Sequence, residues 1–156
     1  MRFNIRDVFL GVAAFFAILH IISIPTGYAA AIATPEGYFD WFRENSSVWL
    51  GVKLFNLVTV FPAMAIPLFI LMYSSTRFFA KSWVIYAVAT IVFVYAHHFW
   101  TIFELIASYP PIFEAYGLSI FWPPIAMPLV ILISAYWANR HIKNEADSVV
   151  AQSTAS

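Results

Sequence analysis

The sequence predicts an all-α membrane protein in which four transmembrane helices form an antiparallel bundle. Of the 156 residues, 62% are hydrophobic and 10% are charged, whereas soluble domains carry about 25% charged residues. Four apolar stretches reach the roughly 20 residues that a bilayer-spanning helix needs. Six basic residues also fall on one side of a chain that spans four times: Arg2, Arg6, Arg77, Lys81, Arg140 and Lys143.

The first predicted span covers 7–30 and follows Arg2 and Arg6. Its apolar stretch, 8–24, is longer than the roughly 7–15 residues of a signal-peptide core. We therefore interpret it as a retained anchor helix. The polar but aromatic segment 34–47 follows, and we expect it to form a short helix in the membrane interface. Its aromatic anchors are Tyr38, Phe39, Trp41 and Phe42.

The remaining predicted spans cover 48–73, 82–108 and 118–139. Proline removes a helix hydrogen bond and kinks the helix, so we expect kinks in the second and fourth spans. The prolines concerned are Pro62, Pro67, Pro123, Pro124 and Pro128. The four spans form one transmembrane domain, 1–140. The polar tail, 141–156, is expected to be disordered.

Charge fixes the predicted orientation and excludes several classes of function. Positively charged loops stay in the cytoplasm, so both termini are expected there. The opposite side holds Arg43 with four acids: Glu36, Asp40, Glu44 and Glu114. Net charge is zero, which argues against a nucleic-acid partner. The chain has no cysteine, which excludes disulfides, thiolate metal sites and thiol redox catalysis.

The third predicted span carries a line of polar residues along one helical face. Residues three or four apart share a face, and the line consists of Tyr86, Thr90, His97, Thr101, Glu104 and Ser108. Ionisable groups at membrane depth usually face a bundle interior, a partner or a water-filled cavity. The sequence therefore predicts an intramembrane polar site on this face.

Lys53 and Asn56 of the second span are expected near the depth of Glu104 and His97. Lys53 and Glu104 either form a structural ion pair, or Lys53 extends towards the head groups, or Glu104 serves a ligand or a proton with Lys53 tuning its pKa. Trp100 and Tyr95 lie deep enough to line an apolar pocket. As ligand-binding residues the sequence thus predicts His97, Glu104, Asn56, Lys53, Thr101, Trp100 and Tyr95.

The histidines leave a cofactor alternative open. His20 is expected at the same depth as His97 and His98, so two of these could be axial ligands of a b-type haem. His20, His97 and Glu104 form an alternative metal set. Neither set has a diagnostic spacing, and the expectation is that no cofactor is bound.

Several segments together resemble the four-helix EXPERA family of sigma-2 receptor and emopamil-binding proteins. They are Leu19-His20-Ile21, FPAMAIPLFIL at 61–71, KSWVIYAV at 81–88 and WPPIAMPLVIL at 122–132. The resemblance implies a pocket for sterols and cationic amphiphiles, and in some members sterol isomerisation. The family's pocket Glu falls at Asn56 here, and no Asp stands near Tyr28 and Ala29.

Three functions follow as hypotheses. The first is binding of a lipid-like or sterol-like molecule in the intramembrane polar site. The second is an accessory subunit of a larger membrane complex or a homo-oligomer, with the polar stripe joining helices. The third is a b-haem electron-transfer protein. Enzyme activity is not expected; if present, it would be isomerisation with Glu104 and His97 as acid and base.

Overall fold

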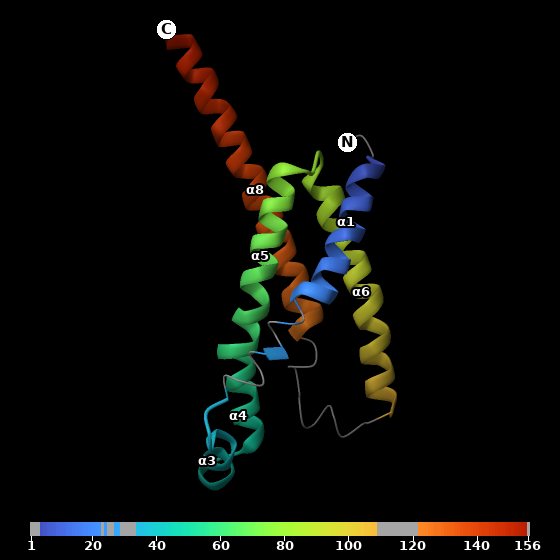
Figure 1. Cartoon of the computed structure of the whole chain (residues 1–156), viewed down its shortest axis with the longest axis vertical. Helices are drawn as coiled ribbons and strands as arrows, with labels where there is room; N and C mark the ends of the chain where they lie inside the picture. Colours follow the sequence, from blue (N-terminus) through green and yellow to red (C-terminus); the bar gives the residue numbers. More distant parts are fainter. Residues whose placement is uncertain (1–3, 23, 25–26, 29–33, 109–121, 156) are drawn as a thin grey trace.

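The structure is a computed structural model that describes residues 4–22, 24, 27–28, 34–108 and 122–155; side chains at 22, 98–108, 122–124 and 152–155 lie outside the description. Within those ranges every regular element is helical, which confirms the all-α class. In chain order the elements are α1 (Ile5–Ala17), η1 (Ile18–Ile22), α3 (Tyr38–Asn45), α4 (Val48–Phe55), η2 (Asn56–Val60), α5 (Phe61–Phe78), α6 (Trp83–Ser108) and α8 (Trp122–Ala155). Figure 1 shows their arrangement.

Helix α1 packs along the first half of α6 at a glycine. Asn4 caps α1, because its side-chain oxygen accepts a hydrogen bond from the Arg6 backbone N–H at 3.2 Å. A Cβ added to Gly11 would lie 2.7 Å from the Ala89 Cβ and 3.0 Å from the Thr90 backbone nitrogen. Small residues let membrane helices approach closely. The crossing of α1 and α6 therefore depends on the missing side chain of Gly11.

A single long helix runs through α4, η2 and α5, with one wide turn in it. The Phe61 N–H donates to the Asn56 carbonyl, five residues back, as in a π-helix. The next residue, Pro62, has no N–H, and its ring clashes with the carbonyl four residues earlier in an ordinary α-helix. The predicted irregularity at Pro62 is therefore a π-turn, whereas Pro67 and, in the fourth helix, Pro128 lie inside continuous helices.

Helix α8 packs against both α5 and α6 and completes the core. Leu68 and Met72 from α5 are fully buried, and so are Ile131 and Ala135 from α8. α6 contributes Tyr86, which is also fully buried. Because Ala135 has a small side chain, α8 can approach its neighbouring helices closely. The core thus lies among α1, α5, α6 and α8.

A second, smaller packed region joins α3 to α4. The Tyr38 hydroxyl donates to the Gly51 carbonyl at 3.0 Å, and a Cβ on Gly51 would lie 2.8 Å from the Phe42 ring. The predicted short aromatic helix is thus present at Tyr38–Asn45. Phe42, expected to anchor in the membrane interface, is instead buried against α4, whereas Trp41 is 59% exposed.

The long helix has the dimensions of a membrane span. Val48–Phe78 is the one helix, within the described residues, that is long and apolar enough to cross a membrane, and Trp83–His97 is apolar but shorter. Only 17% of the most apolar window of Val48–Phe78 is buried, whereas the core helix of a soluble protein would be mostly buried. One membrane-length helix is therefore established by length and composition; the other three predicted spans remain a prediction.

The start of α1, the turn between α5 and α6, and the last turns of α8 lie at one end of the molecule, uppermost in Figure 1. We call this the basic end, because these segments carry Arg6, Arg77, Lys81, Arg140 and Lys143. The tail expected to be disordered is helical here, since α8 continues to Ala155. Its 34 residues extend for roughly 51 Å, so α8 projects well beyond its neighbours (Figure 1).

Candidate functional site

The buried part of the predicted polar stripe begins at Tyr86. This side chain is fully buried, and its hydroxyl lies 2.6 Å from Ser75 Oγ and 3.4 Å from Met72 Sδ. Ser75 Oγ also contacts the Leu71 carbonyl of its own helix. A carbonyl can only accept, so Ser75 donates to Leu71 and the Tyr86 O–H donates to Ser75. This chain of hydrogen bonds joins α6 to α5 and leaves the Tyr86 hydroxyl satisfied.

Thr90 and Thr76 continue the buried polar layer. Thr90 is fully buried, and its hydroxyl donates to the Tyr86 carbonyl at 2.9 Å. Thr76 Oγ1, on α5, is buried without a hydrogen-bond partner within the described part of the chain. The inward orientation predicted for Tyr86 and Thr90 is confirmed. Both residues have local structural roles, however, and neither lines the two apolar grooves described below.

His97 marks the point where the stripe leaves the packed core. Val94, one turn earlier, is buried, but His97 is exposed. Its ring lies edge-on to Phe15 of α1, with 5.9 Å between ring centroids. The side chains predicted to continue the stripe lie outside the described residues, as does that of the adjacent histidine: His98, Trp100, Thr101, Glu104 and Ser108. His97 is therefore the stripe's one described group beyond the core.

The second-span candidates lie on a different arm of the molecule. Lys53 is exposed on α4, and Asn56 is half-buried at the start of the π-turn η2. Figure 1 shows α4 and the second half of α6 as two arms that diverge away from the basic end. The helix that carries Lys53 thus stands apart from the part of α6 that carries Glu104. Tyr95, also on α6, is exposed.

His20 lies on the outer side of the first helix. It is exposed in the π-helical segment η1, and its ring stacks on Phe16 at a centroid distance of 6.4 Å. His97 contacts the neighbouring Phe15 instead. Successive helical residues project about 100° apart, so the two histidines meet different faces of α1. Among the described residues no group of three His, Cys, Asp or Glu side chains could hold a metal ion.

Asp7 forms a buried junction that the sequence reasoning missed. Its carboxylate is fully buried and accepts hydrogen bonds from the Lys81 N–H at 3.0 Å and the Ser82 N–H at 2.9 Å. Asp7 thus ties the start of α1 to the residues immediately before α6. A signal was available: Asp7 is an acidic residue directly beside Arg6, at the start of an apolar predicted span.

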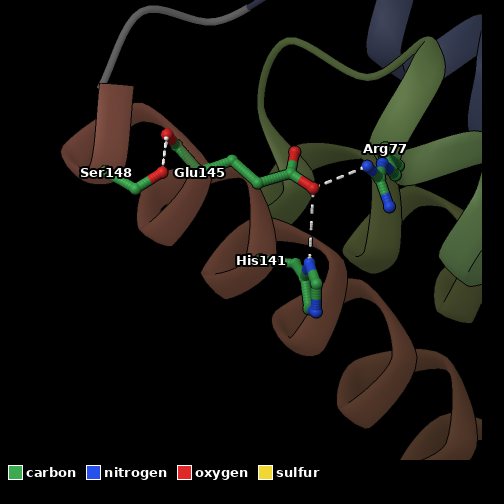
Figure 2. A network of polar contacts seen from close by, with 4 residues as sticks. All are labelled: Arg77, His141, Glu145 and Ser148. Atoms are coloured by element: carbon green, nitrogen blue, oxygen red, sulfur yellow. Dashed lines mark hydrogen bonds and ion pairs between the residues drawn. The ribbon is translucent and has the colours of Figure 1, made fainter. Parts of the chain in front are cut away.

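A polar network at the basic end joins α5 to the α8 extension, the exposed part of α8 from residue 140 onward (Figure 2). Arg77 of α5 forms an ion pair with Glu145 of α8, with 2.7 Å between Nη2 and Oε1. The same oxygen lies 3.6 Å from His141 Nδ1, and the Ser148 hydroxyl donates to the Glu145 carbonyl at 2.8 Å. These groups are largely exposed, so the network orients the extension without forming an enclosed site.

Two apolar grooves open on the surface of the helical core. One, of about 410 Å³, lies where α1 meets α6, and the other, of about 290 Å³, lies between α5 and α8. Their linings are hydrophobic side chains without a titratable group. Such grooves suit hydrocarbon chains better than polar metabolites.

Comparison with known proteins gives this chain no relative from which a function could be taken. No family model, no curated protein and no solved structure matches it. The geometry of the helices and their polar residues is therefore the basis for assigning a function.

Proposed function

We propose that this chain is a four-span membrane protein, with both termini in the cytoplasm, that binds a lipid-like or sterol-like molecule beside His97. One observation carries the proposal. The face of α6 that is buried at Tyr86, Thr90 and Val94 becomes uncovered one turn later, at His97. Ionisable residues at membrane depth often mark ligand sites, and the exposed His97 side chain is accessible to a molecule that enters from the bilayer.

Apolar exposure and charge support the membrane placement. Large hydrophobic side chains are exposed on every long helix, for example Phe9, Val58 at 70% and Ile133. Extensive apolar surface of this kind marks contact with a membrane or a partner. The gathering of arginine and lysine in the segments of the basic end supports a cytoplasmic position for that end.

The surroundings of His97 support the class of ligand. His97 contacts Phe15, and Phe93, one turn before His97 on α6, also contacts Phe15 and is partly exposed. Tyr95, two residues before His97, projects from a different side of α6. A neutral imidazole offers one hydrogen-bond donor and one acceptor. The complementary molecule carries a hydroxyl or carbonyl group on a large apolar body, as sterols and diacylglycerol-type lipids do. The resemblance to the EXPERA family points to the same class.

The other predicted residues complete the proposal. Thr101, Trp100 and Glu104 follow His97 along α6. Lys53 and Asn56 stand on the opposite arm, where they would contact the ligand if the arms enclose it. In this proposal Glu104 binds a polar or cationic group of the ligand and is not committed to a structural ion pair.

Labelling with a photoreactive, alkyne-tagged cholesterol analogue tests the proposal in membranes that contain the full chain. We expect His97→Leu to reduce labelling at least fivefold without changing thermal stability, because His97 is exposed. His20→Leu is the matched control, since His20 is exposed on another face and should leave labelling unchanged. Undiminished labelling of His97→Leu would overturn the proposal. An absorption spectrum of the same preparation tests the haem alternative through its Soret band.

The extension of α8 favours a second candidate, an accessory subunit of a membrane complex. Every residue from 140 to 151 is exposed, including the apolar pair Val149 and Val150. Truncation after Asn139 should release a partner that copurifies in mild detergent, while sterol labelling stays unchanged. If nothing copurifies in stoichiometric amount with the full chain, this second candidate fails.

A further inference from the structure

The larger groove has the length of one lipid leaflet. It runs along the outer side of α6 beside α1, and its lining is Val8, Val84, Ile85, Val88, Ala89, Val92 and Phe93. From residue 84 to residue 93 the helix rises roughly 14 Å. The hydrocarbon core of a bilayer is about 30 Å thick. The groove therefore extends from the basic end to about the middle of the membrane, as the acyl chain of one leaflet does.

A lysine stands at the basic end of this groove. Lys81 precedes the lining residues Val84 and Ile85 by three and four positions, and its side chain is exposed. Its backbone is fixed, because the Lys81 N–H donates to the buried carboxylate of Asp7. The lysine therefore has a defined position relative to both helices that form the groove.

The exposed charge at this position is positive. Both oxygens of Asp7 are fully buried and accept backbone N–H groups, and Lys81 forms no ion pair with a carboxylate of the described residues. Arg77, by contrast, is engaged by Glu145. The smaller groove between α5 and α8 has an equally apolar lining, but its lining residue on α5 nearest the basic end is Ile70, two turns before Arg77.

We infer that the groove between α1 and α6 holds an anionic phospholipid of the cytoplasmic leaflet. One acyl chain lies along the groove, and the phosphate of the head group pairs with the Lys81 ammonium. This inference depends on the membrane placement proposed above but not on a ligand at His97. A lysine near an anionic lipid surface contributes about 1 kcal/mol, or about fivefold in affinity.

Native mass spectrometry of the detergent-purified full chain tests this inference. The protein is titrated with palmitoyl-oleoyl phosphatidylglycerol and, separately, with the phosphatidylcholine that has the same chains. We expect one phosphatidylglycerol to bind about fivefold more tightly than phosphatidylcholine. Equal affinity for the two lipids would overturn the inference.

Three variants separate head-group from chain recognition. Lys81→Gln should remove the preference for phosphatidylglycerol, whereas Lys143→Gln, at the same end of the molecule, should keep it. Val92→Trp fills the groove from an exposed position and should weaken both lipids. Loss of preference in both lysine variants would show general attraction to the basic end and overturn the site. His97→Leu should leave phosphatidylglycerol binding in the groove intact while it reduces sterol labelling. Extraction of the chain from membranes by alkaline carbonate alone would overturn the membrane placement itself.

Discussion

The two halves of the long helix Val48–Phe78 are similarly apolar but have different surroundings. In α5 every fourth residue is buried, at Met64, Leu68, Met72 and Thr76. In α4 and η2 the buried residues are Gly51 and Phe55, next to α3, and Val58 is 70% exposed. Apolar character therefore does not decide where a membrane-length helix packs. The packed half is distinguished by its contact with α8, which presents the small residue Ala135, and by the hydrogen bond between its own Ser75 and Tyr86 of α6.

The comparison also separates structural from functional polar groups. The same division applies to the whole molecule. Near the basic end, where the helices pack together, Asp7 and Tyr86 are buried with hydrogen-bond partners. Away from that end, where the helices diverge, Lys53 and His97 are exposed. Loss of a buried, paired group should reduce stability, whereas loss of an exposed one should change ligand binding with little effect on stability. The four predictions below test this division, from the largest expected effect to the smallest.

Asp7→Ala should have the largest effect on stability. It removes a charged acceptor from two backbone N–H groups, and each such hydrogen bond contributes roughly 1.5–3 kcal/mol. We expect a loss of about 3 kcal/mol, measured by thermal or denaturant unfolding in detergent. Asp147→Ala, at an exposed position on the α8 extension, is the control. A loss below about 1 kcal/mol for Asp7→Ala would mean that the α1–α6 junction does not depend on this carboxylate.

Leu68→Ala and Leu57→Ala make the same chemical change in the two halves of one helix. Leu68 is fully buried, whereas Leu57 is 51% exposed. A buried Leu→Ala change costs roughly 2–5 kcal/mol. We expect about 2 kcal/mol for Leu68, because in the proposed membrane placement lipid and protein interior are similarly apolar and mainly the lost packing remains. Leu57→Ala should cost less than about 0.5 kcal/mol. Equal losses would contradict the division between the halves.

The sequence predicts helices well because apolar length and periodicity are local properties. The third helix was expected at 82–108 and is found at Trp83–Ser108. The spacing of polar residues in the third span correctly predicted that Tyr86 and Thr90 point into the core. Contacts between segments are harder to predict from the sequence, since they depend on how the helices tilt and diverge. The expected matching of Lys53 with Glu104 assumed straight, parallel helices, whereas α4 and α6 diverge (Figure 1).

The α8 extension was expected to be disordered because its composition is polar. Polarity excludes a packed core but not a helix that continues from a packed one. Residues 139–155 contain no proline or glycine, and helix propagation is easier than nucleation.

Asp7 was missed for a related reason. A lone carboxylate near a chain end has no periodicity, and its role becomes visible only when a distant segment presents free N–H groups.

Tyr86→Phe should have a moderate effect confined to the packed half. It removes the hydroxyl that donates to Ser75 and keeps the ring volume. Interhelical hydrogen bonds of this kind contribute about 1 kcal/mol, so we expect a loss of that size in the free energy of unfolding. Tyr95→Phe, at an exposed position on the same helix, should leave stability unchanged. If only Tyr95→Phe destabilised the protein, the assignment of the two halves would be reversed.

Glu145→Gln should have the smallest effect on global stability and should act on the α8 extension alone. The pair with Arg77 is largely exposed, and such pairs contribute roughly 0–1 kcal/mol. We expect about 0.5 kcal/mol, detected as faster amide hydrogen exchange over residues 141–151 and not as a change in global unfolding. Salt screens exposed charges over about 10 Å at 0.1 M, so 1 M NaCl should raise exchange in the wild type towards the variant. Asp147→Asn changes a charge on the same extension that pairs with no described residue, and it should not alter exchange. If high salt leaves the wild type protected, intrinsic helix propensity and not the Arg77–Glu145 pair holds the extension in place.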